Sequence, residues 1–124
     1  MDDRYRKATG SASEDLALAY LRRNGLRLIM RNYRCRRGEI DLVMLDGSTL
    51  ALVEVRYRSR NDFGGAAASV TRRKQRRLIL AAKHLRAARS ELRRYAARFD
   101  VVALDGAVEN PAIEWIRNAF SLER

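Results

Sequence analysis

The chain has 124 residues, of which 47% are hydrophobic, and these values predict one folded domain rather than a disordered chain or a disulfide-stapled miniprotein. Its formal net charge of +11 favours a polyanionic partner, nucleic acid before an anionic membrane surface or an acidic protein. The alternative is a basic surface without a ligand. The chain has one cysteine, no secretory signal and no apolar run of roughly 20 residues, so we expect a cytoplasmic protein without a membrane span.

The first half of the chain predicts a helix and three strands. Residues 1–10 are charged and are interpreted as a flexible tail, which leaves residues 11–124 as a single domain. The segment Ser11-Ala-Ser-Glu14 matches a capping box, so a helix is expected from there to Asn24-Gly25. Strands are predicted over residues 26–34, 38–45 and 49–57, and Asp46-Gly47 between the last two predicts a hairpin turn. The second and third strands carry apolar residues on both faces, which is typical of a sheet centre covered on both sides.

The second half continues with a Gly/Ala-rich loop over residues 61–68 and a helix over residues 71–89. A strand over residues 98–104 follows, and residues 113–120 are expected to form an edge strand or a loop. The order of elements is therefore helix, three strands, helix and strand.

Two acidic residues, Asp41 and Glu54, lie inside the most apolar strands. A buried carboxylate is costly without a partner, and a hairpin between these strands brings the two acids close together. Alternation along the strand places Glu54 and Arg56 on one face. Two converging carboxylates without two matching cations favour a hard divalent metal ion. The alternative is a buried ion pair of Asp41 or Glu54 with Arg56.

A helical wheel places Glu14 between Leu18 and Leu21, on the apolar stripe of the first helix, whereas Asp15 lies on the solvent side. Glu14 is therefore expected to point toward the sheet. Its other interpretation is the acidic partner of the capping box, which by itself would explain a glutamate at this position.

The second helix carries basic residues in two directions. Lys74 shares the apolar stripe with Leu78 and can reach the metal site or a phosphate, or it can snorkel along the edge of the core. Arg72, Arg73, Arg76 and Lys83 gather on the opposite side. They form a candidate phosphate-contacting surface, although a run of charges is also typical of a solvated helix face.

Several motifs together resemble the bacterial YraN-like family, over about residues 10–120. The matching residues are Glu14, Gly38-Glu-Ile-Asp-Leu42, Val53-Glu-Val-Arg56, Arg58, Phe63-Gly64, Lys74 and Arg98-Phe-Asp100. This family is similar to archaeal Holliday junction resolvases and to the PD-(D/E)XK nuclease superfamily. The resemblance implies a restriction-endonuclease-like αβββαβ core, with a central mixed sheet flanked by helices.

The same resemblance implies Mg²⁺-dependent hydrolysis of phosphodiester bonds, with Mn²⁺ as a substitute. Asp41 and Glu54 would be metal ligands, Glu14 would complete the site, and Lys74 would join it. Arg56 occupies the position of the catalytic lysine of the motif, which is a departure from the pattern because a guanidinium is bulkier and does not lose its proton.

Our leading hypothesis is an endonuclease that acts on structured or branched nucleic acid, DNA rather than RNA. The runner-up is a nuclease fold that binds nucleic acid without cutting it, and a basic adaptor protein is third. Arg58 is predicted to join Arg72, Arg73 and Arg76 in contacting the nucleic acid. A homodimer is expected only by analogy with the family.

Overall fold

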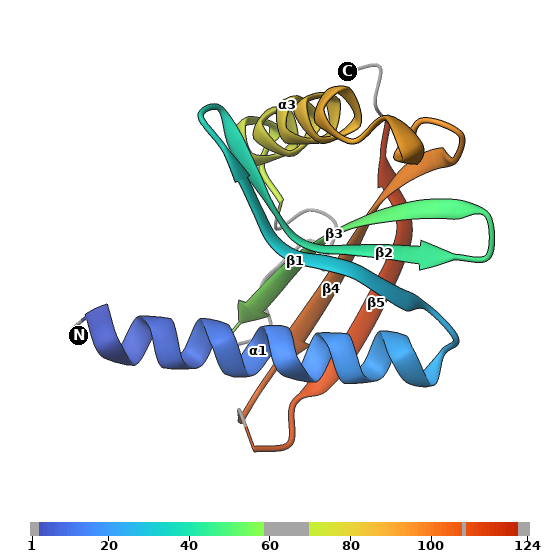
Figure 1. Ribbon diagram of the computed structural model, residues 1–124. Helices are drawn as coiled ribbons and strands as arrows, with labels where there is room; N and C mark the ends of the chain where they lie inside the picture. Colours follow the sequence, from blue (N-terminus) through green and yellow to red (C-terminus); the bar gives the residue numbers. More distant parts are fainter. Residues whose placement is uncertain (1–2, 59–69, 108, 122–124) are drawn as a thin grey trace.

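A single mixed sheet of five strands organises the molecule in the order β1-β2-β3-β4-β5 (Figure 1). The computed structural model describes residues 3–58, 70–107 and 109–121. The strands are β1 (Arg27–Cys35), β2 (Gly38–Asp46), β3 (Thr49–Arg58), β4 (Ala96–Asp105) and β5 (Ala112–Phe120). The pair β3 and β4 is parallel, and the other neighbours are antiparallel. The predicted α/β fold with a central mixed sheet is confirmed, and the last predicted segment is an edge strand, β5.

Two helices cover the two faces of this sheet. Helix α1 (Asp3–Arg23) lies against one face and α3 (Arg72–Ala88) against the other, and a 3-10 turn, η1 (Ser90–Leu92), follows α3 (Figure 1). The apolar side chains accordingly form two buried clusters, one under each helix. Phe99 and Leu85 belong to the α3 cluster, and Leu21 and Leu42 belong to the α1 cluster. In the described part of the chain no helix combines the length and the apolarity needed to cross a membrane.

Helix α1 begins earlier than the capping box predicts. The backbone is helical from Asp3, so Ser11 lies inside the helix and the helix start predicted from the capping box is wrong. Residues 3–10 contain Arg, Lys and Ala, which are good helix formers, and these propensities extend the helix through the proposed cap. The predicted end is confirmed, since Gly25 has a φ of +92° and the amide of Leu26 donates to the carbonyl of Leu21 over 3.1 Å.

The sheet divides between β2 and β3. The hairpin ladder runs from Asp46↔Thr49 to Leu42↔Val53 and stops there. Beyond that point β2 stays paired with β1 as far as Cys35↔Gly38, and β3 stays paired with β4. Figure 1 shows the paired strands β1 and β2 curving toward α3 while β3 continues in another direction. Counted from the hairpin turn, Asp41 on β2 and Glu54 on β3 are the first residues beyond the last pair of the ladder.

The edge strand β5 is held to β4 by a buried carboxylate. Asp100 is fully buried and accepts hydrogen bonds from Arg98 Nε at 3.0 Å, Trp115 Nε1 at 3.1 Å and the backbone amide of Asn118 at 2.9 Å. Asn118 has a φ of +52°, so the chain bends at the point where it meets this acid. The Arg98-Phe-Asp100 motif therefore has a structural role, because it holds the edge strand β5 against β4.

Candidate functional site

Asp41 lies in the opening between β2 and β3. Its Oδ2 accepts a hydrogen bond from the backbone amide of Val55 over 2.8 Å, which satisfies a donor that the interrupted ladder leaves free. Burial, together with the negative charge of Glu54, raises the pKa of Asp41 to about 7. The structure thus holds a carboxylate where its ionised form is disfavoured.

Glu54 lies across the opening, on the side of β3 that faces α3. It is 8% exposed, and its Oε1 lies 3.5 Å from the Nζ of Lys74. Burial raises the pKa of Glu54, and the nearby charges of Lys74 and Arg56 oppose this increase. The expected proximity of Asp41, Glu54 and Lys74 is therefore found, and among the described residues the ion pair of Glu54 is with Lys74 rather than with Arg56.

Arg56 follows Glu54 by two residues and lies close enough to lower the pKa of that acid by its charge. Its Nε is buried and has no hydrogen-bond partner in the part of the chain that the structure describes. A buried donor without a partner is costly, and a phosphate oxygen or an ordered water is the usual remedy. Arg56 thus combines a fixed positive charge with an unused donor beside the acids.

Glu14 approaches the same opening from α1. Its side chain is 18% exposed, whereas that of Asp15 is 63% exposed, which confirms the orientation predicted from the helical wheel. Both acids bind Arg31, at 3.4 Å for Glu14 and 2.8 Å for Asp15. The charge of Glu14 also contributes to the raised pKa of Asp41. Arg31 was not predicted, because its place beside Glu14 depends on how β1 packs under α1.

Glu39 is a second residue that the sequence analysis missed. Its charge contributes to the raised pKa of both Asp41 and Glu54. Together with Glu54, Lys74, Arg77 and Leu78 it lines a small hollow of 30 Å³, which is about the volume of one water molecule. The signal in the sequence was its spacing, because a residue two positions before Asp41 on a strand shares its face.

The donor set suits a hard divalent cation only in part. Asp41 and Glu54 supply carboxylate oxygens, which are the ligands that Mg²⁺ and Mn²⁺ prefer. Within residues 3–58, 70–107 and 109–121, however, no group of three or more His, Cys, Asp or Glu side chains is placed to hold a metal ion. The three-acid set of Glu14, Asp41 and Glu54 is therefore not assembled as such, and the pair Asp41 and Glu54 is the part that fits.

The predicted nucleic-acid contacts separate into two groups. Arg58 is 6% exposed and binds the carboxylate of Asp105 through Nε and Nη2, each over 2.8 Å, so its guanidinium lies inside a buried ion pair at the end of β3. This placement argues against the predicted contact with a phosphate. Arg72, Arg73 and Arg76, in contrast, are exposed on α3.

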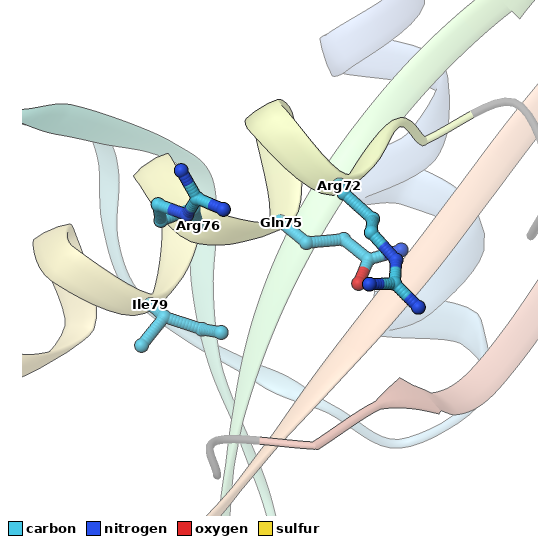
Figure 2. Close-up of a pocket in the computed structure, with 4 residues that line it drawn as sticks. All are labelled: Arg72, Gln75, Arg76 and Ile79. Carbon is cyan, nitrogen blue, oxygen red and sulfur yellow. The ribbon is translucent and has the colours of Figure 1, made fainter. Parts of the chain in front are cut away.

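A hollow of 280 Å³ lies beside two of these exposed arginines, Arg72 and Arg76, and Gln75 and Ile79 complete its described lining. Figure 2 shows the two arginines projecting from successive turns of α3. The hollow therefore combines positive charge with an apolar wall.

Comparison with known proteins places the chain in a family. The model of the "Uncharacterised protein family UPF0102" matches residues 13–104. A UPF0102 protein of Ralstonia nicotianae is 56% identical over 121 residues, covering 94% of this chain and 88% of the relative. Relatives in Cupriavidus taiwanensis and Methylococcus capsulatus are 53% and 50% identical and cover 95% and 96% of this chain, or 86% and 95% of their own lengths. The predicted YraN-like resemblance is confirmed, and the chain belongs to the UPF0102 family.

Proposed function

We propose that this protein is a divalent-metal-dependent endonuclease that hydrolyses phosphodiester bonds in structured or branched nucleic acid. The observation that carries the proposal is the pair Asp41 and Glu54, two neighbouring acids of which Glu54 is buried and Asp41 half-buried, in a chain with a net charge of +11. Because basic residues outnumber acidic ones in this chain, a buried acid with a purely structural role could readily be paired with a lysine or an arginine. A pair whose pKa values are raised by burial instead favours a functional site.

Each residue of the site has a role in this proposal. Asp41 and Glu54 would hold Mg²⁺ or Mn²⁺, and the bound cation would supply Lewis acidity toward the phosphate. Lys74 and Arg56, which both lie near Glu54, would bind the scissile phosphate and stabilise the negative charge that develops on it. Glu14, on the α1 side, would add a negative charge near Asp41 and so help to raise the pKa of Asp41.

A second candidate function is a nuclease fold that binds nucleic acid without cutting it. Two observations favour it. Arg56 stands where the motif has a lysine, and a guanidinium cannot donate its proton or become a neutral amine. In addition, the described part of the chain provides two convergent acids rather than a set of three.

A cleavage panel of linear, branched and single-stranded DNA and RNA, with and without Mg²⁺ or Mn²⁺, separates the two functions. If only positive charge is needed at position 56, the natural protein cuts and Arg56→Lys changes the rate modestly. If a compact ammonium or a neutral amine is needed, the natural protein is slow and Arg56→Lys increases cleavage with little change in affinity; we expect this second result. Glu54→Ala should abolish cleavage in both backgrounds. Cleavage that persists in Glu54→Ala would exclude this site as the active site.

Three further expectations belong to the proposal. DNA is favoured over RNA as the substrate, the location is cytoplasmic, and a homodimer follows only from analogy with the family. Each has a direct measurement: competition between DNA and RNA, cell fractionation, and sedimentation of the purified protein.

A further inference from the structure

Helix α3 carries an unusual charge for a surface helix. Seven of its 17 residues are basic and none is acidic. Three of the basic residues, Arg72, Arg73 and Lys74, occupy the first turn, where the helix dipole favours acidic side chains and opposes basic ones. The positive charge is therefore placed where it weakens the helix unless an anion binds beside it.

The exposed side of α3 has two basic flanks. At about 100° per residue, the exposed surface is centred opposite the buried stripe, which consists of Leu78, Ile79, Ala81, Ala82 and Leu85. Arg72, Arg76 and Lys83 fall on one flank, and Arg73 and Arg77 fall on the other.

Between the two flanks, the most outward line of the helix carries the half-buried Leu80 and the exposed Ala87, which are uncharged. Figure 1 shows α3 on the face of the sheet opposite α1. Positive charge thus lies on both sides of an uncharged line along the helix.

The first flank has two hollows along its length. Arg72 and Arg76 line the 280 Å³ hollow near the start of α3 (Figure 2), and Lys83 and Arg93 line one of 350 Å³ near its end. About ten residues separate the two, which corresponds to roughly 15 Å along the helix axis. Arg93 is fixed in place because its Nε donates to the carbonyl of Arg86 over 2.8 Å. The flank therefore offers two candidate phosphate-binding positions along the helix axis, which one nucleic-acid strand could occupy together.

The second flank is reinforced by the hairpin between β1 and β2. The backbone of Gly38 lies so close to α3 that a Cβ at this position would be 2.0 Å from the carbonyl oxygen of Arg77. This contact places the exposed hairpin residues Arg36 and Arg37 beside Arg77. Arg77 also lines the hollow that contains Glu54, so a strand on this flank passes the edge of the acidic site.

We infer that α3 docks in the major groove of duplex DNA, with one strand along each flank. A helix with its side chains is roughly 10–12 Å wide, and the major groove of B-form DNA is about 12 Å wide. The uncharged line along the helix then faces the base edges, where Leu80 and Ala87 can contact thymine methyl groups. This inference rests on the proposed function for its ligand class, and it adds that the strand on the Arg77 flank is the one presented to Asp41 and Glu54.

Binding is measured with the full chain in EDTA, by fluorescence anisotropy, on ligands of equal length: a DNA duplex, an RNA duplex of the same sequence and a single DNA strand. We expect the DNA duplex to bind at least tenfold more tightly than either of the others. The major groove of A-form RNA is too narrow and deep for side chains to enter, and a single strand can occupy only one flank. Equal affinity for all three ligands, or a preference for the single strand, would overturn the inference.

Three double variants that remove the same charge locate the surface. Arg72→Gln with Arg76→Gln tests the first flank, Arg73→Gln with Arg37→Gln tests the second, and Arg22→Gln with Arg23→Gln, on α1, is the matched control. Each flank variant should weaken duplex binding roughly tenfold or more and lower the slope of log K against log salt by about 2. A control variant that weakens binding as much as the flank variants would contradict the proposed surface.

The two proposals fail separately. Duplex binding without cleavage under Mg²⁺ or Mn²⁺ leaves the inference standing and removes the endonuclease activity. Cleavage that depends on Glu54 but not on either flank keeps the proposed function and removes the docking of α3.

Discussion

Replacing Asp41 with asparagine should stabilise the protein, and the gain should increase with pH. Below a pH of about 7 the folded protein keeps a proton on Asp41, because burial and the charge of Glu54 raise its pKa to about 7. The unfolded chain loses that proton near the ordinary value of 3.8. Between these values the native state binds one more proton than the unfolded state, so the free energy of unfolding decreases as pH rises. Asparagine carries no proton to lose and removes this dependence.

The magnitude follows from the width of the window. One pH unit corresponds to about 1.4 kcal/mol, so the two units between about pH 5 and pH 7 amount to roughly 3 kcal/mol. Titration coupled to that of Glu54 spreads the change over a wider range without changing its sign. We therefore expect the free energy of unfolding of Asp41→Asn, relative to the natural protein, to increase by roughly 2–3 kcal/mol from about pH 5 to about pH 8. Asparagine can still accept the hydrogen bond from the Val55 amide, so the loss of that contact does not mask the effect.

The assay is urea unfolding at several pH values between these limits, with Glu114→Gln on the exposed face of β5 as the control for losing one negative charge. A second set of measurements adds Mg²⁺ or Mn²⁺ at millimolar concentration and records the melting temperature. A cation held by Asp41 and Glu54 should raise the melting temperature of the natural protein, most strongly above about pH 7 where Asp41 is ionised, and Asp41→Asn should lose the increase.

Two results would refute the reasoning. If the difference between Asp41→Asn and the natural protein is constant with pH, the carboxyl does not titrate in the folded state as the structure implies. If both metals leave the melting curve unchanged at every pH, a metal-free acid pair is the better account of the site.

Two further changes test the fold around the site. Gly38→Ala should destabilise the protein by about 1–3 kcal/mol or more, because its Cβ would lie 2.0 Å from the backbone carbonyl oxygen of Arg77 and the hairpin must move away from α3. Urea unfolding measures the loss, and an unchanged unfolding midpoint would contradict the close approach of Gly38 to α3. Asp100→Ala should cost about 3–5 kcal/mol, because it removes a fully buried carboxylate that accepts hydrogen bonds from Arg98 Nε, Trp115 Nε1 and the Asn118 amide. Hydrogen exchange should show β5 amides losing protection, and full protection would mean that the network does not hold this strand.

Local signals predicted most of the secondary structure. The strands β1 to β4 and the helix α3 lie within about two residues of their predicted bounds, because apolar periodicity and the glycines at positions 25 and 47 are read from adjacent residues. The start of α1 was wrong because the capping box is a short pattern, and the helix-forming residues before it extend the helix. Burial on both faces of β2 and β3 was predictable, since apolar residues occupy both the odd-numbered and the even-numbered positions of those strands.

The candidate site was predicted in its members more than in its arrangement. The acids Asp41 and Glu54 stand out in the sequence because charged residues are rare inside apolar strands. Lys74 and Glu14 needed a helical wheel, and both point as it predicted. The ion pair of Arg58 was not predicted, because its partner Asp105 lies 47 residues away in the chain and becomes its neighbour only through the parallel pairing of β3 and β4.

By itself, the sequence determined which residues are candidates and on which face of a helix or strand each one lies, since periodicity is a property of neighbouring residues. Only the tertiary structure decided where β2 and β3 separate, because that depends on β2 following β1 while β3 follows β4. This separation leaves Asp41 between the two strands, takes the Val55 amide out of the ladder, and lets Glu14 from one face and Lys74 from the other approach the same pair of acids. Pairing choices of this kind are made between segments far apart in the chain, where a local pattern carries no information.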